Sequence, residues 1–135
     1  MANLKLHVSF NLPAFVKQHL KAVARNRYTS YTAVLIESAD RYLANRGLDQ
    51  EALKDKPHQR IGSYTKSKLA LHEFLNKNNL HVEDESWKPI LSHFELPIET
   101  IEAITDGALY HGLTKTAFLS LCILELSVSE VRKAA

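Results

Sequence analysis

Four polar side chains recur at every second position near the start of the chain, so together they could bind a polar ligand. Lys5, His7, Ser9 and Asn11 supply one fixed positive charge and a row of hydrogen-bond donors and acceptors. Such a row is typical of a strand that contacts the edges of nucleic-acid bases. It is equally typical of any strand face in contact with water, so this pattern alone leaves both interpretations open.

Apolar side chains fill the alternate positions of the same segment, which reads LHVSFNLP from Leu6 to Pro13. Strict alternation predicts a two-faced strand, with Leu6, Val8, Phe10 and Leu12 on the face opposite the polar row. Pro13 suits the first turn of a following helix, because that position donates no hydrogen bond within a helix.

Two amphipathic helices are predicted next, separated by a short polar turn. Apolar residues spaced three and four apart indicate a first helix that ends near Arg27. Ser30 is a good N-cap for the second helix, and Gly47 is its stop signal. Residues 1–47 are therefore predicted to form a strand, a helix, a turn and a helix.

The middle of the chain, residues 48–86, is more polar and is predicted to be a connector with one docked helix. A short helix is expected at 50–55, and a longer one at 66–77 with Ser63 or Thr65 as its cap. The apolar stripe expected on the longer helix comprises Leu69, Ala70, Phe74 and Leu75.

The last third of the chain repeats the first at an offset of 84 positions. This offset places Leu96-Pro97 on Leu12-Pro13 without a gap, and it aligns TSYTAVL at 29–35 with LTKTAFL at 113–119. Gly112 falls opposite Tyr28, at a helix end that favours positive φ. We therefore expect two structural copies, residues 1–47 and 87–135, which together form one compact domain.

Both copies resemble the ribbon-helix-helix DNA-binding family, the class of the Arc and MetJ repressors, through LPAFVKQHLKAVARNRYTSYTAVLIESA and LPIETIEAITDGALYHGLTKTAFLSLCI. The first copy departs from the family at Tyr28, where glycine is usual, whereas the second keeps Gly112. The resemblance implies a mainly α fold with a short two-stranded antiparallel β-ribbon, and the helical connector would join the two copies into a pseudo-dimer. This tandem arrangement is similar to that of TraY-like relaxosome accessory proteins of conjugative plasmids. Whether the strands pair within one chain or between chains stays open.

The resemblance also implies that the ribbon lies in the major groove of double-stranded DNA. The side chains that would contact bases are Lys5, His7, Ser9 and Asn11 from the first copy, and Leu91, His93 and Glu95 from the second. Asn11 could pair with adenine, and Lys5 with guanine or a phosphate. Glu95 repels phosphates but could accept a hydrogen bond from cytosine. The second copy is therefore either a reader of bases or only a structural partner.

Phosphate contacts are expected where the second helix of each copy begins, because unpaired N–H groups and the helix dipole favour an anion there. The residues at these two positions are Ser30, Tyr31 and Thr32 in the first copy, and Thr114, Lys115 and Thr116 in the second. Ser30 and Thr114 could instead be helix caps alone, and the two roles are compatible.

Charge is distributed unevenly along the chain. Residues 1–48 contain seven Lys or Arg and two acids, a net charge of +5, whereas residues 49–86 and 87–135 have net charges of −1 and −2. A polyanion is therefore expected to meet the first third of the chain.

No residue pattern indicates catalysis, and we expect neither an enzyme nor a cofactor. The four glycines form no phosphate-binding loop, the seven histidines lack zinc-ligand spacing, and Cys122 lies in an apolar run where a thiol is unreactive. No segment reads as a signal peptide or membrane span, so a cytoplasmic protein without membrane contact is expected.

The last helix is apolar on nearly every side, through Ala117, Phe118, Leu119, Leu121, Cys122, Ile123, Leu124 and Leu126. Either the connector helix covers this excess, or another copy of the chain or a protein partner does. The leading interpretation is sequence-specific binding of double-stranded DNA, in transcription regulation, plasmid transfer or partition. The alternative is a protein-interaction module that keeps the fold without binding DNA.

Overall fold

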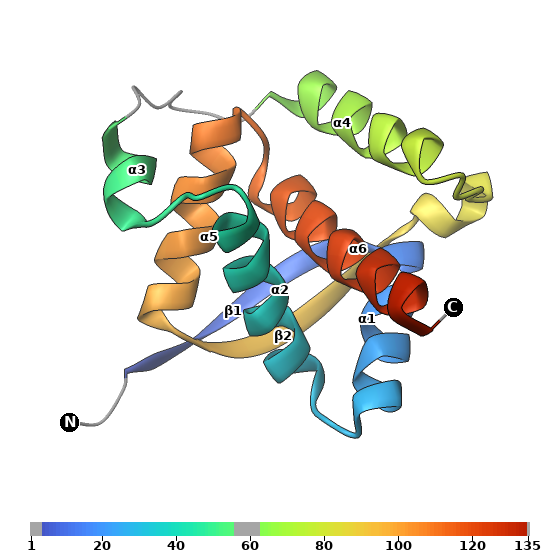
Figure 1. Ribbon diagram of the computed structural model, residues 1–135, viewed down its shortest axis with the longest axis horizontal. Helices are drawn as coiled ribbons and strands as arrows, with labels where there is room; N and C mark the ends of the chain where they lie inside the picture. Colours follow the sequence, from blue (N-terminus) through green and yellow to red (C-terminus); the bar gives the residue numbers. More distant parts are fainter. Residues whose placement is uncertain (1–3, 56–62, 135) are drawn as a thin grey trace.

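The computed structural model describes residues 4–55 and 63–134, which form a short β-ribbon and helices packed against it (Figure 1). The elements are β1 (Lys5–Pro13), α1 (Ala14–Arg27), α2 (Tyr31–Asn45), α3 (Gln50–Asp55), α4 (Tyr64–Lys77), the 3₁₀ turn η1 (Asp84–Trp87), β2 (Pro89–Pro97), α5 (Ile98–His111) and α6 (Lys115–Ala134). The predicted order of strand, helix, turn and helix is confirmed for residues 5–45, and it recurs from β2 to α6.

β1 and β2 pair antiparallel, and the segments that meet are those related by the offset of 84. Ser9 stands opposite His93, its own counterpart at that offset. On either side of this pair, His7 faces Glu95 and Asn11 faces Leu91. The two segments therefore pair within one chain, which answers the question that the sequence left open.

The inner face of the ribbon is apolar and covered by the helices. Phe10 and Phe94 are buried, with ring centroids 6.3 Å apart, and Leu12 and Leu96 have no exposed surface. Leu6 lies on the same face but is 46% exposed, because it stands near the end of the ribbon. Burial along β1 thus follows the alternation that the sequence predicted, except at this end.

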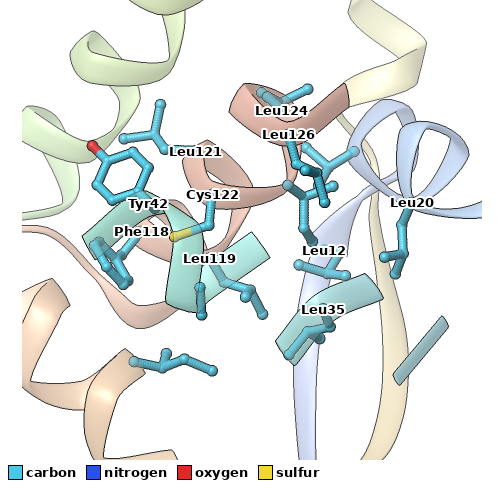
Figure 2. Packing of buried hydrophobic residues seen from close by; sticks show 14 of the residues in the cluster. Leu12, Leu20, Leu35, Tyr42, Phe118, Leu119, Leu121, Cys122, Leu124 and Leu126 are labelled. Carbon is cyan, nitrogen blue, oxygen red and sulfur yellow. The ribbon is translucent and has the colours of Figure 1, made fainter. Parts of the chain in front are cut away.

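The structure contains two strand-helix-helix units, the first comprising β1, α1 and α2 and the second β2, α5 and α6, and their helices interlock. α2 contacts β2 and α6 contacts β1, so each second helix packs on the strand of the other unit, and α2 also packs along α6. Figure 2 shows Leu12 of β1, Leu35 of α2 and Leu119 of α6 in the same interior. Because burial of apolar surface is the main stabilising force in folding, the two units stabilise each other.

Backbone hydrogen bonds repeat at the offset of 84. The Ala14 N–H donates to the Lys88 carbonyl over 2.9 Å, and the Ile98 N–H donates to the Leu4 carbonyl over 3.1 Å. One bond at the turn repeats as well. The Thr29 N–H donates to the Ala24 carbonyl, and its counterpart, the Leu113 N–H, donates to the Ala108 carbonyl. The repeat is therefore a property of the backbone as well as of the sequence.

Both first helices end on a residue in the left-handed conformation. Gly112 has φ 70° and Tyr28 has φ 54°. Glycine adopts this conformation without a steric cost, whereas a residue with a Cβ does not. The prediction of positive φ at this position is confirmed, and Tyr28 adopts it although its side chain is 97% exposed and gains little packing there.

α4 packs against α6, so a helix of the connector covers the apolar excess of the last helix. The face in contact follows a four-residue spacing, through Ser67, Leu71 and Leu75. The prediction that Leu69 belongs to the buried stripe is wrong, because Leu69 lies off this line and is 57% exposed. Ser63, and not Thr65, caps α4 by accepting a hydrogen bond from the Lys66 N–H.

Candidate nucleic-acid interface

The outer face of the ribbon collects every side chain predicted to contact bases. Residues Lys5, His7, Ser9, Asn11, Leu91, His93 and Glu95 are all exposed, and they share this face because side chains alternate along a strand. In Figure 1, α2 and α6 cross in front of the ribbon. These helices cover its apolar inner face, which is the side opposite the polar row. The polar row is therefore presented on a surface that the helices leave open.

One hydrogen bond crosses the centre of this face. The Ser9 Oγ and the His93 Nδ1 are 2.7 Å apart. This bond positions the imidazole ring and leaves the Nε2 atom on its other side to bond with water or a ligand. Ser9 and His93 thus form a single polar unit at the middle of the ribbon.

Charge on the outer face is mixed. Lys5 and Glu95 both lie toward the end where β1 begins, and Asn11 beside Leu91 forms the other end without a formal charge. The face therefore offers hydrogen bonds more than a continuous positive potential. Any strong attraction for a polyanion must come from cations beyond the ribbon.

The start of α2 is the first of the two predicted phosphate sites. The Ser30 Oγ accepts a hydrogen bond from the Ala33 N–H over 3.1 Å, so the predicted cap is confirmed. Ser30 and Tyr31 are exposed and Thr32 is half-buried. Backbone N–H groups of the first turn can still bind an anion at such a capped end.

The start of α6, the second predicted phosphate site, is partly covered by α4. The Thr114 Oγ1 accepts from the Ala117 N–H over 3.2 Å, which makes Thr114 a cap as predicted. The Thr114 N–H itself donates to the Ser67 Oγ over 2.9 Å, and the Ser63 N–H donates to the Gly112 carbonyl. Lys115 is exposed, whereas Thr116 is half-buried. The two predicted phosphate sites are therefore unequal.

A cavity of about 750 Å³ lies between α4, the start of α6 and the end of β1. Its polar walls include Asn11, Tyr64, Lys68, Asp84 and Thr116. Tyr64 and Lys68 were not among the predicted site residues, because their helix was expected to be part of the connector. The only signal for their position was the Ser63 to Ser67 spacing, which sets both serines on one side of α4.

An acidic groove of about 720 Å³ lies away from the outer face of the ribbon, between α2, α3 and α5. Among the residues that the structure describes, its carboxylates are Asp40, Asp49, Glu99, Glu102 and Asp106, and its one lysine or arginine is Lys54. Partial burial raises the pKa of Asp40 above its ordinary value. Glu95 lies on the outer face of the ribbon and Glu99 in this groove, so the two carboxylates do not share one surface.

The structure also shows the surroundings of the cysteine and of the possible metal ligands. Cys122 is buried in α6, and burial raises the pKa of its thiol well above the usual value, which makes it a poor nucleophile. Across residues 4–55 and 63–134, no three His, Cys, Asp or Glu side chains are grouped so that they could hold a metal ion.

Within the same ranges, no single helix has the length and apolar character to cross a membrane, and only α5 and α6 taken together, bent by 101°, meet that test.

Comparison with protein-family models, curated proteins and solved structures finds no match to this chain.

Proposed function

We propose that this chain binds double-stranded DNA in a sequence-specific manner, through a tandem ribbon-helix-helix fold whose ribbon lies in the major groove. The observation that carries the proposal is the pairing of β1 with β2, which sets seven candidate base-contacting residues on one open face. A two-stranded ribbon fits the major groove, where every base pair presents a distinct pattern of donors and acceptors.

The proposed readers have side chains suited to different bases. The Asn11 amide can pair with the N6 and N7 atoms of adenine, and the Lys5 ammonium can donate to the O6 and N7 atoms of guanine. Leu91, which is 56% exposed, can contact a thymine methyl group, and Glu95 can accept a hydrogen bond from cytosine N4.

Phosphate contacts would fix the ribbon in the groove. The open start of α2, with Ser30, Tyr31 and Thr32, would bind one phosphate through backbone N–H groups and hydroxyls. The excess of basic residues in the first third of the chain favours the approach of a polyanion to that third. A cytoplasmic role in transcription regulation, plasmid transfer or plasmid partition would use such binding.

A salt series on duplex DNA tests the proposal. We expect random-sequence duplex to bind at low ionic strength, with an affinity that falls steeply as salt increases, because bound lysine and arginine side chains release counterions from phosphates. Fluorescence anisotropy of a labelled duplex measures this affinity. If the chain fails to bind duplex even at low ionic strength, the proposal is wrong.

The acidic groove favours a second function, the binding of a basic protein segment. Five carboxylates around Leu43, Leu48 and Leu53 offer charge and an apolar floor to such a segment. A lysine-rich model peptide would then bind the wild-type chain and lose affinity in Glu102→Gln. Glu73→Gln, on the exposed side of α4, is the matched control. Equal affinities in both variants would exclude this function.

A further inference from the structure

α4 partly covers the second of the two predicted phosphate sites, which is the start of α6. The Thr114 N–H, one of the groups that could bind an anion there, already donates to the Ser67 Oγ. A second bond joins the Ser63 N–H to the Gly112 carbonyl, so α4 is held against the turn at both points. At the start of α2, by contrast, Ser30 and Tyr31 remain exposed.

α4 also supplies side chains that can bind an anion in place of the Thr114 N–H, which Ser67 already engages. Lys68 and Tyr64 of α4 line the cavity, together with Thr116 of α6. Lys68 is exposed and Tyr64 is 80% exposed, so both can reach a ligand that enters from outside. Lysine ammonium and hydroxyl groups are the side chains that proteins use to contact DNA phosphates.

The cavity is continuous with the outer face of the ribbon through Asn11, which belongs to both. A duplex whose bases meet Asn11 would therefore bring its backbone to this cavity. Asp84 lies in the η1 wall and repels phosphate, so the backbone is expected along the α4 wall.

We infer that the DNA backbone beside the second unit is bound by α4, through Lys68 and Tyr64, and not by the start of α6 alone. The inference rests on the proposed DNA binding and names the residues that make the contact on one side. The connector would thus be part of the interface, and the two flanks of the ribbon would hold DNA by different means.

Lys68→Gln tests the inference, with Lys66→Gln as the matched control, because Lys66 is exposed on the same helix but does not line the cavity. In the salt series, the slope of log affinity against log salt should fall by about 0.9 in Lys68→Gln, the loss of one phosphate contact, and stay unchanged in Lys66→Gln. Asp84→Asn should raise the affinity.

The outcomes separate this inference from the proposed function. Wild-type slopes in Lys68→Gln, in a chain that does bind DNA, would overturn the role of α4 and leave the DNA-binding proposal standing. Failure of the wild-type chain to bind duplex at low salt would overturn both. Phosphate-ethylation interference gives an independent measurement, because Lys68→Gln should lose interference on one flank of the site only.

Discussion

Ser9 and His93 face each other at the centre of the ribbon, 84 positions apart in the chain, with the Ser9 Oγ 2.7 Å from the His93 Nδ1. The backbone around them is nearly two-fold symmetric, but the side chains are not. Asn11 occupies in the first unit the position of Glu95 in the second. The outer face therefore has two different halves.

This asymmetry predicts an asymmetric DNA target. A palindromic site would present the same base edges to two unlike halves, so it could satisfy only one of them. Selection of bound duplexes from a random library should recover a motif without two-fold symmetry. A palindromic motif would show that the ribbon side chains do not determine the sequence.

Asn11→Ala should relax the sequence preference at one base position by about 1–3 kcal/mol, because it removes a bidentate contact to a base edge. Binding to duplexes that vary at single positions measures this change. Asn45→Ala, at the far end of α2, removes the same amide from an exposed site outside the ribbon and should leave the preference intact. Equal weakening on all sequences in Asn11→Ala would mean that Asn11 only positions the backbone.

Tyr28→Gly should stabilise the protein by about 0.5–1 kcal/mol. The left-handed conformation costs an L-residue about 1–2 kcal/mol, and part of the gain is offset by the greater entropy of glycine in the unfolded chain. Tyr28 is 97% exposed, so little packing is lost. Urea unfolding measures the change, and Tyr28→Ala is the control that removes the ring but keeps the strain. A loss of stability in Tyr28→Gly would show that the ring makes a contribution that exposure conceals.

Gly107→Ala should destabilise the protein by about 1–3 kcal/mol, because overpacking forces neighbours to shift. A Cβ at this position would lie 2.7 Å from the Cε2 atom of Phe118, which is fully buried between α5 and the other helices. The cost should be smaller in a Phe118→Leu background, where the ring is absent. A double-mutant cycle by urea unfolding checks this, and additive changes would contradict it.

His19 should make stability depend on pH. Burial lowers its pKa in the folded protein below the 6.5 of the unfolded chain, so the unfolded state takes up the proton first as the pH falls. The stability associated with neutral His19 is present above pH 6.5 and is lost as the pH falls from there through the folded pKa.

Urea unfolding from neutral to mildly acidic pH measures this loss. His19→Gln should lose less stability than the wild-type chain over that range. His81→Gln, at an exposed site, should behave like wild type. A wild-type pH dependence in His19→Gln would contradict the prediction.

The fold was predictable where one physical rule acts locally. Alternating polarity located β1, helix spacing located α1 and α2, and the offset of 84 located the strand that pairs with β1. Glycine at position 112 indicated a left-handed helix end, and Tyr28, which aligns with it, adopts the same conformation. Each of these features depends on residues that are neighbours in sequence or related by the repeat.

The remaining features depend on contacts between segments that no pattern relates. The face of α4 that meets α6 runs through Ser67 and Leu71, and an apolar Leu69 on the outside misled the prediction. The partial closure of the α6 start by Ser67 needs the position of α4 in space, as does the acidic groove formed by α2, α3 and α5. The ribbon-helix-helix resemblance stays a prediction.

Each unit packs its second helix on the strand of the other unit, and this packing has a consequence for how the protein assembles. Partners that must meet to fold are joined by one covalent chain, so folding is a first-order process, and the paired state does not dissociate on dilution. A few molecules can therefore present a fully assembled ribbon at concentrations where a two-chain equivalent would come apart.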